Sequence, residues 1–167
     1  MKKLILIGLM FFFIQSFSQE TGKKELRKQK ENTEFISTEA LIDSMKFKFN
    51  ASHALPQDGP SIDLTTNPNY LIIKGDSIYC SMPFFGRAYN VNYNDRGGFH
   101  FAGIVENFKK NENTKKMKIE LKFKMKSPMD SYQFLMTITG SKNTSLTIIS
   151  NKRASISYWG EIDILNK

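Results

Sequence analysis

The feature that most constrains the fold is an alternation of apolar and polar side chains that runs from about residue 46 to the end of the chain. The alternation is clearest in KIELKFKMK, residues 118–126, where every second residue is apolar and each residue between is Lys or Glu. Successive side chains of a β-strand point to opposite faces, so this pattern predicts a strand with one buried and one hydrated face. Strands of this kind are typical of antiparallel sheets.

The same two-residue period recurs in residues 46–55, 132–139, 144–150 and 155–165. Turn-forming stretches separate the apolar segments, and KGDS at residues 74–77 is typical of a tight hairpin. No helical period is long enough to connect parallel strands, so we predict a mainly β fold: an antiparallel β-sandwich or β-barrel of about eight strands with one short N-terminal helix. The residues predicted to face the core are Phe47, Phe49, Ala51, His53, Leu55, Ile119, Leu121, Phe123, Met125, Tyr132, Phe134, Met136, Ile138, Leu146, Ile148, Ile156, Tyr158, Ile162 and Ile164.

The predicted helix lies just before the first strand, in FISTEALIDSM, residues 35–45, where Ser37 and Thr38 are candidates for its N-cap. The preceding segment, residues 19–34, is strongly basic and almost free of apolar side chains. Such a segment cannot bury enough apolar surface to offset the entropy lost on ordering. We expect residues 19–34 to be a mobile leader or a frayed helix, followed by a single β domain at residues 35–167.

The first 18 residues have the features of a secretory signal peptide. Lys2 and Lys3 precede an apolar run, and small residues at Ser16 and Ser18 suit cleavage after Ser18. The apolar run is shorter than the about 20 residues that a membrane-spanning helix needs, and no cysteine follows it to carry a lipid. We therefore expect an exported protein, periplasmic or secreted, with no transmembrane segment and no lipid anchor.

Charge and cysteine content exclude several classes of function. The formal net charge is +8, but an exported protein meets little nucleic acid, so we expect no nucleic-acid partner. Much of the charge falls on alternate strand positions, where lysines keep one face of the sheet hydrated. Cys80 is the one cysteine in the sequence and alternates with Ile78 and Met82, so we predict a core residue rather than a catalytic thiol.

One long stretch, residues 82–101, concentrates aromatic residues, arginines and glycines. Pro83 cannot donate a ladder hydrogen bond, and strand-like alternation resumes near Phe99. We interpret residues 83–98 as a long connection that crosses between two strands, and a binding role for it is left open. The aromatic residues expected to cover the open end of the core are Phe84, Phe85, Tyr89 and Tyr93.

Two segments carry a resemblance to a known family. LIIKGDSIYCSMPFFGRAYNVNYNDRGGFHFAG, residues 71–103, and NKRASISYWGEI, residues 151–162, resemble the exported bacterial family catalogued as domain of unknown function 4251. The most specific matches are residues 83–89 and 153–160, although Phe84 stands where the family often has Tyr. The resemblance implies export and a similar order of elements, and it implies no activity.

Six residues are candidates for a ligand site. Arg87 and Arg153 adjoin aromatic runs, where a guanidinium could bind an anionic group or could tie down a turn. Trp159 could form a platform for a sugar ring or a partner protein, or could pack against the N-terminal helix, and we favour the helix contact. The candidate ligand-binding residues are Phe85, Arg87, Tyr89, Arg153, Tyr158 and Trp159.

No motif indicates catalysis, a cofactor or a metal. His53 falls on the predicted apolar face and His100 on the opposite face from Phe99, and two separate histidines without cysteine partners make a poor metal set. The sequence has no nucleophile elbow, zinc-protease motif, phosphate loop or dinucleotide fingerprint. We therefore predict an exported, non-catalytic binding module for an apolar or anionic small molecule, monomeric or weakly dimeric. The alternative is a structural or protein-interaction domain of the cell envelope.

Overall fold

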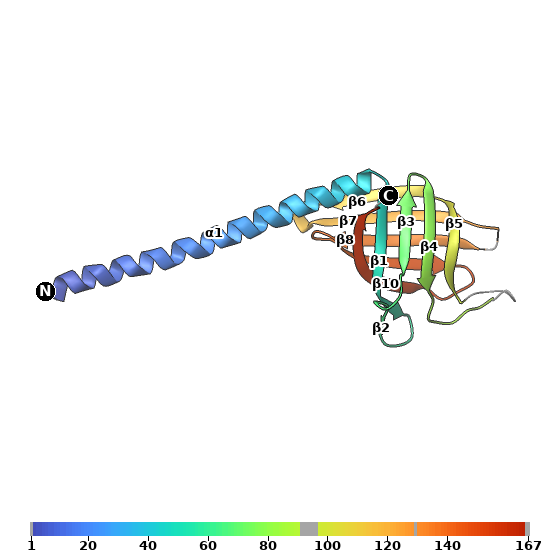
Figure 1. The fold of residues 1–167 in the computed structure, drawn as a ribbon, viewed down its shortest axis with the longest axis horizontal. Helices are drawn as coiled ribbons and strands as arrows, with labels where there is room; N and C mark the ends of the chain where they lie inside the picture. The colour runs from blue at the N-terminus through green and yellow to red at the C-terminus, as the bar shows by residue number, and fades with distance from the viewer. Residues whose placement is uncertain (1, 91–96, 129, 166–167) are drawn as a thin grey trace. The chain divides into compact units, whose positions relative to one another are not determined.

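The structure, a computed structural model, describes residues 2–90, 97–128 and 130–165. The chain divides into two compact units, Met1–Glu34 and Phe35–Lys167. Helix α1 (Lys2–Asp43) runs through the first unit into the second (Figure 1). In the part of the chain that the structure describes, no helix combines the length and the apolar character needed to span a bilayer.

The helix is longer than the short helix predicted near residues 35–45, because it begins at Lys2. Residues 23–34 consist largely of Lys, Glu, Gln and Arg, which are strong helix formers. Two ion pairs one turn apart, Arg27–Glu31 and Lys30–Glu34, add to this local preference. The segment expected to be a basic leader is therefore helical.

The second unit contains a single sheet of ten strands, all paired antiparallel. The sheet curls into a half-barrel, with β1, β3, β4 and β5 crossing over β6, β7 and β8 (Figure 1). The prediction of a mainly β, antiparallel, barrel-like fold with an N-terminal helix is confirmed. The strand order is β5-β4-β3-β1-β10-β9-β8-β7-β6, with β2 paired to β1. The strands are β1 (Lys46–Pro56), β2 (Ile62–Asp63), β3 (Tyr70–Lys74), β4 (Ser77–Pro83), β5 (Gly98–Ile104), β6 (Glu106–Asn113), β7 (Lys118–Lys126), β8 (Ser131–Thr139), β9 (Asn143–Ser150) and β10 (Ile156–Ile164).

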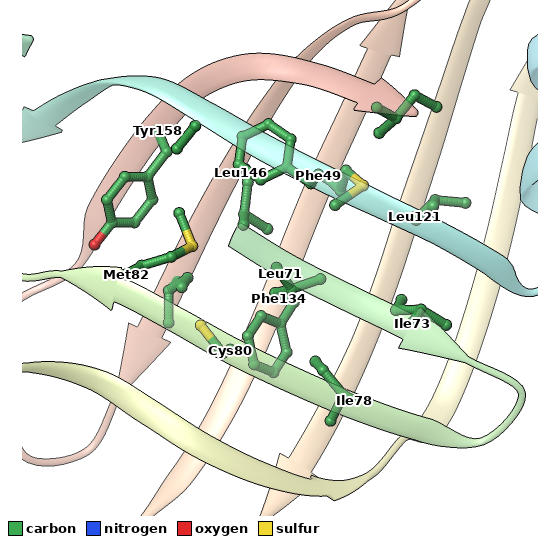
Figure 2. Close-up of a cluster of buried hydrophobic side chains, with 14 of the residues drawn as sticks. Phe49, Leu71, Ile73, Ile78, Cys80, Met82, Leu121, Phe134, Leu146 and Tyr158 are labelled. Atoms are coloured by element: carbon green, nitrogen blue, oxygen red, sulfur yellow. The ribbon is translucent and has the colours of Figure 1, made fainter. Parts of the chain in front are cut away.

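The concave face of the sheet is filled by apolar side chains from both of its halves, as Figure 2 shows. The inward residues predicted in β7 and β9 are all buried, as are nearly all of those in β8 and β10. Aromatic rings pack face to face in this core, with ring centres 4.8 Å apart for Phe123 and Phe134. Cys80 is buried among them, as predicted, and burial raises the pKa of its thiol.

The prediction that His53 and Leu55 face the core is wrong. The register of β1 against β10 shifts between Ala51 and His53, which is a β-bulge. A bulge adds one residue to one strand and so reverses the alternation beyond it. Ala54 is therefore the buried residue, while His53 lies on the outer face.

Strands β6 and β7 are joined by a short 3₁₀ helix, η1 (Thr114–Lys116). One further prediction fails at a strand end. Ile164, predicted to face the core, is 63% exposed at the end of β10. Its exposure shows that the alternation of β10 no longer corresponds to burial at the last residue of the strand.

The end of α1 closes one side of the half-barrel. Phe35 and Ile42 are buried in the core, and the Thr38 hydroxyl donates to the carbonyl of Ser141 in the β8–β9 turn. On the opposite side of the helix end, the Lys110 ammonium lies 2.6 Å from Asp43 Oδ1. Partial burial works against this charge, but hydrogen bonds to Asp43 and Glu39 outweigh it and raise the pKa of Lys110.

Gly160 of β10 is required where β10 meets the β1 bulge. A Cβ at Gly160 would stand 1.9 Å from the carbonyl oxygen of Asn50 and 2.9 Å from Cα of Ala51, and both are backbone atoms that cannot rotate away. We expect Gly160→Ala to lower the free energy of unfolding by about 3 kcal/mol, measured by chemical denaturation. The control is Gly140→Ala, where the space is free but φ is +65° and the expected loss is about 1 kcal/mol. Equal losses at the two positions would contradict the steric account.

Candidate functional site

Four of the six predicted site residues, Arg87, Tyr89, Arg153 and Tyr158, gather at one end of the half-barrel. The connection after β4 runs alongside the segment before β10, since the Ala154 amide donates to Arg87 O at 2.9 Å and the Tyr89 amide donates to Lys152 O at 2.8 Å. Ala88 and Arg153 form an isolated β-bridge between these hydrogen bonds. Backbone pairing thus fixes residues 87–90 of the connection against the segment before β10. The connection does not cross between distant strands as predicted, because β4 and β5 pair directly with each other.

Arg153 is half-buried and packs on aromatic rings. Its guanidinium carbon lies 5.0 Å from the ring centre of Phe84 and 5.4 Å from that of Phe99. These are cation–π distances, and two rings shield one guanidinium from water. The contacts favour the structural interpretation of Arg153, in which the arginine holds the connection against the strands.

Tyr158 faces the core and holds the same connection in place by a hydrogen bond. Its side chain is fully buried, and its hydroxyl donates to the carbonyl of Pro83 at 2.6 Å. Burial raises the pKa of Tyr158 and keeps the phenol protonated as a donor. Tyr158 is therefore engaged within the protein rather than turned toward solvent.

The remaining residues of the connection divide between core and solvent. Phe84 and Phe85 are half-buried and pack on the core, as predicted, whereas Tyr89 is 64% exposed and Arg87 is also exposed. Tyr93 lies outside the described residues. A ligand role for Arg87 and Tyr89 stays a prediction.

Trp159 lies on the opposite, outer face of the sheet and is 54% exposed. The interpretation that it packs against the N-terminal helix is wrong, because the buried residues of the helix end face the core instead. Its cross-strand neighbours are His53 on β1 and Ser145 on β9, and Ser145 in turn pairs with Thr137 on β8. The indole therefore has a polar side chain on each side, an imidazole on β1 and a hydroxyl on β9.

A groove of about 390 Å³ surrounds the indole. Its floor is formed by β9 and β10 and its sides by β1 and β8, and most of its side chains carry a hydroxyl or an amide. We call it the Trp159 groove, and its lining residues are Ser52, His53, Thr137, Thr139, Asn143, Thr144, Ser145, Trp159, Gly160 and Glu161.

A hydrogen-bond chain fixes His53 beside the indole. The Ser52 hydroxyl donates to the carbonyl of Trp159 at 3.1 Å, so its oxygen accepts from His53 Nδ1, also at 3.1 Å. In the neutral imidazole this assignment places the proton on Nδ1 and leaves Nε2 as an acceptor. The β1 bulge thus positions a hydrogen-bond acceptor at the edge of the groove.

A second hollow of about 420 Å³ adjoins the first and shares Ser52, Gly160 and Glu161 with it. One wall is the loop between β2 and β3, which is bound to the β1 bulge by the Leu64 amide to Ser52 O and the Ala51 amide to Asn69 O. We call it the loop-side hollow, and its lining residues are Lys48, Asn50, Ala51, Ser52, Leu64, Thr65, Asn67, Pro68, Asn69, Gly160, Glu161 and Asp163.

The charges around the two hollows do not form a metal site. Within the described ranges, no group of three or more His, Cys, Asp or Glu side chains is placed to hold a metal ion. Asp163 is engaged by the Ile164 amide and by Lys142, and these hydrogen bonds lower the pKa of the Asp163 carboxyl. Glu161 is the one carboxylate that lines the Trp159 groove itself.

Sequence reasoning singled out Trp159 but missed its neighbours. Thr137, Asn143 and Ser145 are ordinary outward residues of two strands, and only the cross-strand register brings them to the indole. All three fall on outward positions of their strands, as Trp159 does, and this can be read from the sequence. The order of the strands in the sheet cannot. The groove therefore becomes visible only in the folded chain.

The Tyr158 anchor can be tested by removing one oxygen atom. Tyr158→Phe keeps the ring in the core but leaves the carbonyl of Pro83 without its donor, so we expect a loss of about 1–2 kcal/mol in the free energy of unfolding. Tyr79→Phe is the matched control, because Tyr79 is on the outer face and exposed. Urea denaturation of both variants measures the difference. Similar stability of the two variants would contradict the anchoring role.

Comparisons with known proteins place the chain in a family. The family model described as "Domain of unknown function (DUF4251)" matches residues 29–162. A crystal structure of a DUF4251 family protein from Bacteroides eggerthii DSM 20697 is similar in fold, with a TM-score of 0.61 and 21% sequence identity. That similarity covers 80% of this chain and 89% of the other. No curated protein matches the chain. The chain therefore belongs to the DUF4251 family of domains of unknown function.

Proposed function

We propose that the chain is an exported, non-catalytic binding module whose ligand occupies the Trp159 groove. The observation that carries this proposal is the exposed indole of Trp159 at the centre of a hollow lined by hydroxyl and amide groups. An exposed indole offers a flat apolar face and an N–H donor, and tryptophan is enriched at binding interfaces. The surrounding polar groups can orient a bound molecule and make the site selective.

The packing of the interior supports a site on the surface. The side chains of the concave face are almost completely buried, and those of Phe49, Leu71 and Phe134 meet within it (Figure 2). A barrel that carries a ligand inside needs an unfilled interior. The outer-face groove is thus the better place for a ligand than the core.

The Ser52–His53 pair supports binding rather than catalysis. In a catalytic pair, the histidine accepts the proton of the serine hydroxyl. Here the Ser52 hydroxyl donates to the carbonyl of Trp159, and His53 donates to Ser52. The direction of these hydrogen bonds leaves the serine oxygen unactivated.

The chemistry of the groove favours a ligand with an apolar face over an anion. The indole supplies the apolar contact surface that such a ligand needs. Glu161 would repel an anionic ligand at the same place. The arginines considered for anion binding lie at the end of the half-barrel rather than in the groove, and Arg153 is held there by two rings.

The test uses Trp159 both as the binding group and as the reporter, because it is the one tryptophan in the sequence. Intrinsic fluorescence is measured against a panel of neutral sugars, organic anions and organic cations. We expect a ligand from the panel to change the emission, and Trp159→Ala to weaken its binding at least about tenfold by calorimetry. Leu135→Ala is the control, since Leu135 is exposed on β8 outside the groove. Equal binding by both variants would refute the site.

A second candidate function is a protein-interaction domain of the cell envelope. It is favoured by Tyr79 and Ile104, two exposed apolar residues on the outer face of β4 and β5. β5 ends the sheet order, and an edge strand can pair with another chain. If a Tyr79→Ser variant still binds the ligand of the Trp159 groove, then the Tyr79 surface is distinct from that groove.

Export is the part of the proposal that rests on residues 1–18. A basic start, an apolar run and small residues before Gln19 support cleavage by a signal peptidase. We expect expression of the full chain in a bacterial host to give a protein outside the cytoplasm whose N-terminal residue is Gln19. Intact-mass measurement and N-terminal sequencing of the fractions check this. A full-length chain confined to the cytoplasm would contradict export.

A further inference from the structure

We infer that the ligand is a neutral glycan chain that lies across β10, with one part on Trp159 and the next part in the loop-side hollow. This inference rests on the proposed function, because it names the ligand class of the same site. Its basis is that the two hollows adjoin, since Ser52, Gly160 and Glu161 line both of them. A single small molecule would fill one hollow, whereas a chain of rings can occupy both.

The Trp159 groove has the two kinds of surface that a sugar ring requires. One face of a pyranose ring presents C–H groups, which pack on an aromatic face, while its rim carries hydroxyl groups. Trp159 offers the aromatic face, and Thr137, Asn143 and Ser145 lie around it. Hydroxyl and amide side chains both donate and accept hydrogen bonds, as sugar hydroxyls do.

The acceptors in the groove select for hydroxyl donors. His53 Nε2 is an acceptor in the tautomer that the Ser52 hydrogen bond favours, and Glu161 contributes carboxylate oxygens. A cation would suit Glu161, but recognition of an alkylammonium group uses a cage of several Trp, Tyr or Phe rings, and Trp159 is the one such residue among those that line this groove. A neutral polyol satisfies these groups without placing two like charges together.

The two hollows meet at Ser52, Gly160 and Glu161, which line both of them. Gly160 carries no side chain, and the Asn50 carbonyl fills the space where a Cβ would stand, so backbone closes the sheet at this point. The Ser52 hydroxyl is engaged by the carbonyl of Trp159. A chain of rings that reaches both hollows would pass over this backbone.

The loop-side hollow has a wall that is ordered in advance. The side-chain amide of Asn69 donates to Leu64 O at 2.8 Å and to Asn67 O at 2.7 Å. The backbones of Leu64 and Asn69 are in turn hydrogen-bonded to the β1 bulge. A wall fixed before binding lowers the entropy lost when the ligand is held. Asn50 and Asn67 are exposed in this hollow and offer amide groups to further hydroxyls.

The hollow also carries charges of both signs. Lys48 lies 5.2 Å from the ring centre of Tyr70 and lines the hollow together with Glu161 and Asp163. Opposite charges in one hollow do not favour an ion of either sign, but each can bind a hydroxyl group. The charge distribution therefore fits a neutral chain along the whole length of the two hollows.

The experiment uses the full chain and compares its binding to short and long forms of the same neutral sugars. The probes are the disaccharides and hexasaccharides of β-1,4-glucose, α-1,4-glucose, β-1,4-xylose, β-1,4-mannose and β-1,4-N-acetylglucosamine, and a sulfated hexasaccharide is included as an anionic probe. We expect at least one hexasaccharide to bind at least about tenfold more tightly than its disaccharide by calorimetry. A preference for the sulfated probe, or equal affinity for both lengths, would overturn the inference.

Variants assign the two parts of the ligand to the two hollows. Trp159→Ala is expected to abolish binding of both lengths, whereas Asn50→Ala and Asn67→Ala reduce hexasaccharide affinity several-fold and leave the disaccharide unchanged. Asn151→Ala is the matched control, because Asn151 is exposed and lines neither hollow. Binding of both lengths that is unaffected at Asn50 and Asn67 would overturn the inference.

The glycan assignment and the proposed binding site would be refuted by different results. Binding of a non-sugar ligand that depends on Trp159 would overturn the glycan assignment and leave the proposed function standing. Sugar binding that survives Trp159→Ala would refute the proposed site itself. No binding to any probe at about 1 mM, which corresponds to about −4 kcal/mol, would overturn the glycan assignment.

Discussion

The close approach of β1 to Gly160 is the contact on which the rest of the structure depends. In the strand order, β1 and β10 are the pair that joins β3, β4 and β5 to the strands from β9 to β6. At their junction the Asn50 carbonyl occupies the space of a missing Cβ, and β1 bulges between Ala51 and His53. The bulge lets the sheet bend into a half-barrel, since bulges increase local twist. The same bulge turns His53 outward and shapes the floor shared by the two hollows.

Alternation predicts the strands well where a strand is regular and covered by a second layer. In β7 the four residues Ile119, Leu121, Phe123 and Met125 are all buried, because nothing interrupts the period. Prediction fails at His53, where an extra residue shifts the register. The candidate site is harder to predict than the fold, because its side chains become neighbours only through the order of β8, β9, β10 and β1. Trp159 can be identified as a candidate from the sequence alone, because a single tryptophan at an outward strand position is conspicuous even when the order of the strands is unknown.

The two segments that carry the family resemblance meet in the structure, and their shared contacts are structural. Tyr158 donates to Pro83 O, Arg153 packs on Phe84, and the Ala154 amide donates to Arg87 O. Together these contacts close the end of the core with an arginine, a buried phenol and a stretch of paired backbone. For Phe84, Arg153 and Tyr158, the aromatic and basic side chains of these segments thus have a structural role.

Placing a ligand on the outer face separates binding from stability. The filled core supplies the apolar burial that holds the sheet together, so substitutions at Phe49 or Phe134 act on the free energy of unfolding. Substitutions at Thr137, Ser145 or Asn67 remove no buried apolar surface, and surface changes of this kind alter stability little. Under the proposed function, the residues that line the groove could therefore be changed without loosening the core. Gly160 is the position where fold and groove meet, because it must stay small for β1 to approach β10 and it also lines both hollows.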